Sequence, residues 1–144
     1  LYYNSKAELH LAGKNMPKWL IDKRDKNVFN HGNVADAKDF MQKYDIMLVP
    51  ILSAGGIRVK IIEGMALGKT IISTKIGAEG LSYVNNENIL IADSPEDFGK
   101  ISEKLFSKKD ELIRIGENAR RHVLENYDQS NISKKLISFF EYFL

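Results

Sequence analysis

The chain has 144 residues, which is enough for one domain with a hydrophobic core. Hydrophobic residues make up 44% and charged residues 28%, as in ordinary globular proteins, and a net charge of +2 does not favour general nucleic-acid binding. Cysteine is absent, which excludes a disulfide framework and a thiolate zinc site. No apolar run approaches the roughly 18 residues that a membrane-spanning helix needs.

Strand-like and helix-like segments alternate from the start of the chain. We expect, in order, a strand over residues 7–12, a helix over 16–23, a strand over 27–31, a helix over 36–44, a strand over 45–50, a helix over 57–67, and strands over 70–74 and 88–92. Asp36 is a candidate N-cap, and Gly68 directly follows a predicted helix end.

Helices complete the chain. Ser94, Pro95 and Asp97 supply a cap, a first-turn proline and an acidic third position, which together predict a helix start. A longer helix is expected over residues 109–127. The final helix carries an apolar stripe, whose phenylalanines we expect to pack on this domain: Phe139, Phe140 and Phe143.

The fold class follows from these repeated units. The segments DIMLVP (45–50) and TIIST (70–74) have the apolar character of strands inside a parallel sheet. We therefore predict an α/β fold, a Rossmann-like parallel sheet flanked by helices on both faces, in a single domain over residues 1–144. In such sheets ligands bind beyond the carboxyl ends of the strands, which directs the search to residues 13–15, 31–34, 50–58 and 75–81.

The segment GGIRVKIIEGMALGKTIIST, residues 55–74, holds the most informative group of side chains. Gly55 and Gly56 stand directly before the predicted helix, where glycine allows a close backbone approach to a ligand. Arg58 and Lys60 then place two cations in the first turn, where they oppose the helix dipole unless an anion is bound. This segment therefore predicts an anion site.

Glu63 follows Lys60 by three residues, about 60° further around the helix. Its neighbours Ile61 and Ile62 are apolar, so the carboxylate needs polar partners. It could accept hydrogen bonds from ribose hydroxyls while Arg58 and Lys60 meet phosphates. The alternative is a solvated Lys60–Glu63 ion pair worth a few tenths of a kcal/mol, beside glycines that merely form a turn. Spacing alone leaves both hypotheses open.

Residues 57–81, IRVKIIEGMALGKTIISTKIGAEGL, resemble the signature of the C-terminal, donor-binding domain of GT-B glycosyltransferases of the group 1 (family 4-like) class. The segments ELHLAGKN, FNHGNVAD and DIMLVPIL precede it in the family's order. The resemblance covers about Glu8 to Tyr127. It implies one half of a GT-B enzyme, in which this domain binds a nucleotide-sugar and a facing N-terminal domain binds the acceptor.

The resemblance also implies roles for individual residues. Glu63 would hold the ribose hydroxyls, and Arg58 and Lys60, the candidate catalytic residues, would lie toward the diphosphate. The substrate-binding set also includes the loop before the helix: Pro50, Gly55, Gly56 and Ile57. Four residues at a strand end would border the nucleobase: His31, Gly32, Asn33 and Val34. A lone histidine at a strand end is more often structural, and that alternative stays open.

Two departures from the family pattern matter. Many members carry a second glutamate eight positions before the ribose-binding one, and that position is Gly55 here, which weakens the inference about how the sugar is held. Members also carry an Arg and a Lys earlier in the domain, and no matching segment precedes Leu1. We expect a piece of a longer protein that lacks its first strand–helix unit and its whole N-terminal acceptor domain, and that is inactive alone.

The chemistry implied by the resemblance is transfer of a hexose from a nucleotide-sugar, with retention, to a saccharide or lipid-linked acceptor in polysaccharide biosynthesis. Helix N–H groups and basic side chains would stabilise the departing diphosphate. No cofactor, metal or nucleic acid is implied. The expected location is cytoplasmic, with the full-length protein at the inner face of the membrane; the basic pairs 108–109 and 120–121 fit either a solvated surface or an anionic membrane contact.

Other functional classes are typical of parts of this sequence pattern. A non-catalytic, flavodoxin-like phospho-receiver fits TIIST followed by Lys75, but the strand 45–50 ends in Pro50 and not in the acceptor Asp that a receiver needs. An NAD-binding domain needs G-x-G-x-x-G after a strand, which the sequence lacks. A glycosyltransferase relative that keeps only the scaffold stays open.

Overall fold

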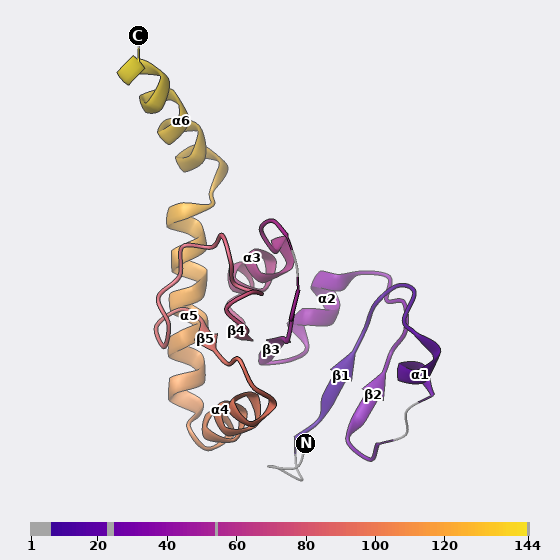
Figure 1. The fold of residues 1–144 in the computed structure, drawn as a ribbon. Helices are drawn as coiled ribbons and strands as arrows, with labels where there is room; N and C mark the ends of the chain where they lie inside the picture. Colours follow the sequence, from indigo (N-terminus) through magenta and orange to yellow (C-terminus); the bar gives the residue numbers. More distant parts are fainter. Residues whose placement is uncertain (1–6, 23–24, 54, 144) are drawn as a thin grey trace.

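The computed structural model describes residues 7–22, 25–53 and 55–143 (Figure 1). Its elements are β1 (Leu9–Leu11), α1 (Lys18–Ile21), β2 (Val28–Asn30), α2 (Ala37–Gln42), β3 (Ile46–Val49), α3 (Val59–Ala66), β4 (Thr70–Ser73), β5 (Leu90–Ile91), α4 (Pro95–Ser107), α5 (Lys109–Asn126) and α6 (Gln129–Phe143). The predicted order of strands and helices is confirmed, with most elements shorter than predicted. Lys23, the last residue of the first predicted helix, lies outside the described residues.

Two helix starts follow local rules that the sequence displays. The Asp36 carboxylate accepts hydrogen bonds from the backbone N–H groups of Lys38 at 2.6 Å and Asp39 at 3.0 Å, and thereby caps α2. The Ser94 hydroxyl accepts one from the Asp97 N–H at 3.1 Å and caps α4. Since these side chains satisfy N–H groups that a helix cannot pair internally, they fix where each helix begins.

All strand pairs are parallel, and the strands form two sheets. One sheet pairs β1 with β2, and the other has the order β3-β4-β5. Within the described residues no ladder of hydrogen bonds joins β1 to β3, so the single sheet that we expected is divided at that point. Figure 1 shows β1, and not β2, on the side of its sheet that faces β3.

The core surrounds β4. Ile71 and Ile72 have no exposed surface, and neighbouring residues of a strand point to opposite faces of its sheet. Ile71 packs with side chains of α3 and α5: Ile61, Met65, Ala119 and Val123. Ile72 packs on the other face with Leu105 of α4 and Ile115 of α5. Both faces of β4 are thus covered, as the apolar run in its sequence predicts.

α6 extends away from the two sheets beyond the end of α5 (Figure 1). The expected packing of its phenylalanines on the domain is wrong for two of them, because Phe139 is 58% and Phe140 56% exposed. Their rings meet edge-on at 5.7 Å. The side chain of Phe143 lies outside the described part. Among the described residues, no helix combines the length and the apolar character needed to cross a bilayer.

Candidate functional site

The glycine loop before α3 leaves its backbone accessible. Gly56 has a φ of +77°, a conformation that favours glycine. A Cβ added at Gly55 or Gly56 would have no described atom within 4 Å outside its chain neighbours. Ile57, the next residue, is 51% exposed. A ligand can therefore approach this backbone closely, as the sequence predicts for an anion site.

α3 begins two residues later than predicted, so Arg58 is its N-cap residue and does not lie in its first turn. Its Nη1 donates to the carbonyl oxygen of Gly55 at 2.7 Å and also to that of Gly56. Its Nε and Nη2 are buried, and neither has a hydrogen-bond partner among the described residues. Since buried polar groups are nearly always paired, this edge of the guanidinium has unused capacity for an acceptor.

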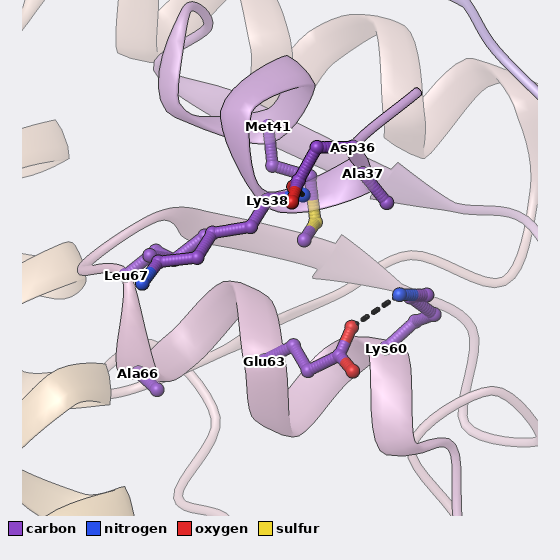
Figure 2. A pocket seen from close by; sticks show the side chains of 8 residues that line it. All are labelled: Asp36, Ala37, Lys38, Met41, Lys60, Glu63, Ala66 and Leu67. Carbon is purple, nitrogen blue, oxygen red and sulfur yellow. Dashed lines mark hydrogen bonds and ion pairs between the residues drawn. The ribbon is translucent and has the colours of Figure 1, made fainter. Parts of the chain in front are cut away.

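Lys60 and Glu63 form an ion pair on the surface of α3, between Nζ and Oε2 (Figure 2). The two side chains are 59% and 43% exposed. This is the i,i+3 pair of the second hypothesis, and an exposed pair of this kind contributes little to stability. The pair nevertheless lies where Glu63 could also bind a ribose and Lys60 a phosphate, because both residues line a cavity.

That cavity lies between α2 and α3 and has a volume of about 500 Å³ (Figure 2). Ligand pockets typically measure about 300–1,000 Å³. Residues of both helices line it: Asp36, Ala37, Lys38, Met41, Lys60, Glu63, Ala66 and Leu67. Charged groups of both signs thus line the cavity together with methyl and thioether groups, a mixture suited to a polar ligand with a flat apolar part.

Asp36 supplies a fixed negative charge at the start of α2. The backbone N–H groups of Asp39 and Lys38 hold the pKa of this carboxyl below its usual range, and burial opposes them. The positive charges of Lys38 and Lys60 lower the pKa further. Asp36 is therefore a carboxylate at neutral pH, and it senses the charge of Lys60 across the cavity.

The structure brings only part of the predicted site together. Lys60 and Glu63 line the cavity. Among the described residues, the other predicted ones lie outside its lining: Arg58, Gly55, Gly56, Ile57, Pro50, His31, Gly32, Asn33 and Val34. Their roles stay predictions.

Asp36, Lys38 and Met41 were not predicted as cavity residues, because they lie beyond the predicted strand-end segment 31–34. Ala66 and Leu67 follow Glu63 by three and four residues, so helical spacing could have found them.

His31 belongs to an aromatic cluster between β1, β2 and α2. Its Nε2 lies 3.0 Å from Nδ1 of His10, whose Nε2 lies 3.2 Å from Glu8 Oε2. The His10 ring stacks on Tyr44 with centroids 4.3 Å apart, and the His31 ring meets Phe40 edge-on at 5.3 Å. These contacts agree with the structural alternative for His31, since they fix its ring without any ligand.

Comparison with known proteins identifies the family. The model of the family described as "Glycosyl transferases group 1" matches residues 2–108, well over half of the chain. The chain belongs to the group 1 glycosyltransferases. The family that residues 57–81 suggest is thereby confirmed, and this membership favours a glycosyltransferase domain over a phospho-receiver.

Solved structures of other glycosyltransferases have the same fold. The C-terminal domain of the group 1 family protein LpcC from Francisella tularensis has a TM-score of 0.64, with 24% identity, over 73% of this chain and 56% of that one. Anabaena Alr3699/HepE in complex with UDP has a TM-score of 0.71, with 17% identity, over 80% of this chain and 32% of that one. These structural matches confirm the α/β fold and cover the C-terminal half of GT-B glycosyltransferases.

A relative in sequence is an uncharacterized 44.6 kDa protein in the cps region of Klebsiella pneumoniae, 28% identical over 124 residues. The match covers 84% of this chain and 31% of that protein. The chain thus spans about a third of the length of the Klebsiella protein and of HepE.

Proposed function

We propose that this domain binds the nucleotide of a nucleotide-sugar donor between the α2–α3 cavity and the Gly55–Gly56 loop. In the whole protein it would transfer the sugar, a hexose, to an acceptor with retention of configuration. The observation that carries the proposal is Glu63 in the cavity wall, one turn after Lys60 in α3. α3 is the helix that follows β3, and ligands of wound parallel sheets bind beyond the carboxyl ends of the strands, where the following helices begin.

Glu63 is suited to hold a ribose. Its two oxygens offer roughly four acceptor positions, and the ion pair with Lys60 involves Oε2. A vicinal diol presents two donors to one carboxylate, and each charge-assisted hydrogen bond contributes roughly 1.5–3 kcal/mol. When the diol occupies Glu63, the Lys60 ammonium is released toward the phosphates. Glu63 therefore has two alternative partners, Lys60 in the free protein and the ribose in the complex.

The diphosphate would lie at the start of α3. There the unpaired N–H groups of the first turn favour negative charge, and Lys60 adds a full cation. Nε and Nη2 of Arg58 form the side-on edge of its guanidinium, which is the geometry that binds a phosphate with two parallel hydrogen bonds. Arg58 and Lys60 would stabilise the charge that develops on the leaving diphosphate.

Relatives guide the choice of donor and acceptor to test. HepE has been solved with UDP and with UDP-glucose, so uridine nucleotides come first. The location of the Klebsiella relative in a cps region favours a saccharide or lipid-linked acceptor and polysaccharide synthesis, at the cytoplasmic face of the membrane. We expect the 144-residue chain alone to bind donor without transferring sugar, because acceptor binding requires the N-terminal half of a GT-B enzyme.

Calorimetry with the full-length protein tests the ribose assignment. UDP, GDP and ADP are titrated into the wild type, into Glu63→Gln and into the control Glu117→Gln, which removes an exposed carboxylate from α5. We expect Glu63→Gln to weaken the best nucleotide by roughly 1.5–3 kcal/mol, since a charged acceptor is lost, and the control to have no effect. Equal affinities of wild type and Glu63→Gln for every nucleotide would show that Glu63 does not hold the ribose.

A further inference from the structure

Two histidines lie on the same face of the sheet formed by β1 and β2. His10 is opposite Phe29 in the parallel ladder, and His31 follows Phe29 by two residues. Since neighbouring residues of a strand point to opposite faces, these three side chains share one face. Phe40 of α2 and Tyr44, just after α2, contact the imidazole rings there. The two rings are thus held between the sheet and the α2 segment.

Hydrogen bonds connect this histidine pair to a carboxylate. Glu8 Oε2 lies 3.2 Å from Nε2 of His10, and Nδ1 of His10 lies 3.0 Å from Nε2 of His31. The His10 side chain is 16% exposed, whereas Glu8 and His31 are exposed. Among the described residues, no side chain or backbone group forms a hydrogen bond with Nδ1 of His31. The chain of hydrogen bonds therefore begins at a carboxylate and ends at an exposed imidazole.

The carboxylate determines which nitrogens of the neutral pair carry hydrogen. An ionised carboxylate only accepts hydrogen bonds, so Nε2 of His10 is a donor to Glu8. In a neutral imidazole the other nitrogen is then an acceptor, so Nδ1 of His10 accepts from Nε2 of His31. Nδ1 of His31 is left without hydrogen. The neutral pair therefore presents a hydrogen-bond acceptor at its exposed end.

A single added proton has only one place in this arrangement. Nε2 of His10 is already protonated, and the hydrogen bond between the two rings holds one hydrogen. The third hydrogen must therefore lie on Nδ1 of His31. The charge can reside on either ring, because the shared hydrogen can belong to either facing nitrogen, but Nδ1 of His31 is protonated in both cases. The titration is thus a property of the pair and not of one residue.

We propose that Glu8, His10 and His31 form a proton-sensitive relay, which takes up one proton at Nδ1 of His31 and converts that atom from a hydrogen-bond acceptor into a donor. Histidine is the side chain suited to such a switch near neutral pH. A second proton would place two N–H groups against each other and break the bond between the rings. The relay therefore holds one proton while it is intact.

The surroundings of the pair favour a single positive charge. Glu8 supplies the opposite charge at one end of the relay. The rings of Phe29 and Tyr44 stack on the His10 ring, with centroids 4.9 and 4.3 Å away, and aromatic faces attract cations. Among the described residues, Glu8 and Tyr44 are the titratable side chains that contact the pair. No described lysine or arginine forms a printed-range contact that would oppose the charge.

The relay ends at a strand end, where ligands are expected. His31 directly follows β2, and ligands of wound parallel sheets bind beyond the carboxyl ends of the strands. A ligand group that reaches Nδ1 of His31 would meet an acceptor on the neutral pair and a charged donor on the protonated pair. An anionic group such as a phosphate would therefore bind better to the protonated pair. The inference does not depend on Glu63 as the ribose-binding residue.

NMR spectroscopy of the imidazole nitrogens tests the proposal in the full-length protein labelled with 15N-histidine. The variants His10→Phe and His31→Phe assign the signals, and His10→Gln and His31→Gln replace them if they do not fold. His122 is the internal control, because its Nδ1 lies 3.3 Å from Asn126 Nδ2 and not beside another histidine. The signals are followed in the wild type as the pH is lowered.

We expect Nε2 of His10 to stay protonated throughout the titration. The first proton should shift Nδ1 of His31 by the full difference between an unprotonated and a protonated nitrogen. The two facing nitrogens should show intermediate shifts, since they share one hydrogen, and a second proton should enter in a separate step at lower pH. In His31→Phe the proton should appear at Nδ1 of His10 instead.

Three results would overturn the proposal. An unprotonated Nε2 of His10 in the neutral pair would show that Glu8 does not orient this ring. A first proton on Nδ1 of His10, with Nδ1 of His31 unchanged, would show that the rings are not hydrogen-bonded. Full protonation of both rings in one step would show that they titrate independently.

Discussion

The region from β3 to α5 and the region from β1 to α2 share the same strand–helix pattern but differ in how much they bury. Of the described hydrophobic residues that are buried, all except Ala7 lie at Val49 or later. β1 and β2 have no buried residue, whereas β4 is buried throughout. The comparison teaches that an apolar strand sequence specifies a strand, while its burial depends on neighbours that other parts of the polypeptide supply.

The candidate site joins these unequal regions. One wall of the cavity, α2, belongs to the first region, and the other, α3, belongs to the second. One hydrogen bond between the regions runs from Lys69 Nζ to the Gln42 carbonyl at 3.0 Å. α3 is held by the core through Ile61 and Met65, whereas α2 has no buried residue. A ligand that contacts both walls would therefore stabilise α2 more than α3.

The largest effect on stability is expected from a substitution that creates a cavity in the core around β4. Ile71→Ala removes a side chain with no exposed surface from β4 and should lower the free energy of unfolding by roughly 2–5 kcal/mol. The matched variant Leu9→Ala lies in β1, where no residue is buried, and should lower the free energy of unfolding clearly less. Urea denaturation of both variants measures the difference. Similar losses would show that the two regions are equally well packed.

A second comparison uses glycines. In Gly116→Ala the new Cβ would lie 2.2 Å from the Gly68 carbonyl oxygen, which is a backbone atom, so α5 must shift away from the turn before β4. We expect a loss of roughly 1–3 kcal/mol in thermal or urea unfolding. Gly13→Ala in the first region is the control, since its Cβ would meet only Met16 Cε, at 3.7 Å. A neutral Gly116→Ala would mean that α5 is not packed this closely.

Binding measurements sharpen the comparison at the site itself. Lys60→Gln should weaken binding of a nucleoside diphosphate about tenfold, or about 1.4 kcal/mol, because Lys60 is assigned to the phosphates. It should not weaken binding of the nucleoside, because the lost ion pair competes with the ribose for Glu63. Arg58→Lys should behave similarly, since lysine cannot replace a two-point phosphate contact. Calorimetry with both ligands separates the roles. An equal loss of affinity for the nucleoside and for the nucleoside diphosphate would show that these residues do not contact the phosphates.

The smallest expected effect is a pH dependence of the stability of α2. Because the folded protein lowers the pKa of Asp36, the carboxylate stabilises α2 above the pKa it has in the unfolded chain. This contribution is lost as the pH falls through the lower pKa of the folded state. We expect the α2 amides of Lys38 and Asp39 to lose exchange protection over that acidic range. Asp36→Asn, which keeps a capping side chain without the charge, should remove the pH dependence.

Much of the fold could be predicted because the signals are local. The Asp36 and Ser94 caps and the apolar runs of β3 and β4 depend on neighbours within a few residues, and each gave the correct element. The division between β1 and β3 could not be predicted, since pairing between strands far apart in the chain depends on tertiary packing and not on neighbouring residues. The apolar stripe of α6 led to a wrong prediction for a similar reason, because Phe139 and Phe140 define an apolar face but do not specify what it packs against.

The site could be predicted only in part. The i,i+3 spacing correctly predicted that Lys60 and Glu63 lie close together, and both line the cavity. The turn conformation at Gly55–Gly56 was not visible in the sequence, and it places Arg58 at the N-cap with its Nη1 on the glycine carbonyls. Asp36 was recognised as a cap, but its place opposite Lys60 depends on how α2 packs beside α3, which is a tertiary property.

The central claim is that Glu63 exchanges its ion pair with Lys60 for the ribose of a donor nucleotide. A crystal structure of the full-length protein with UDP, or with the nucleotide that binds best in calorimetry, tests it most directly. We expect both ribose hydroxyls within hydrogen-bond distance of the Glu63 carboxylate and the diphosphate at the start of α3, beside Arg58 and Lys60. A nucleotide bound elsewhere, with the Lys60–Glu63 ion pair intact, would contradict it.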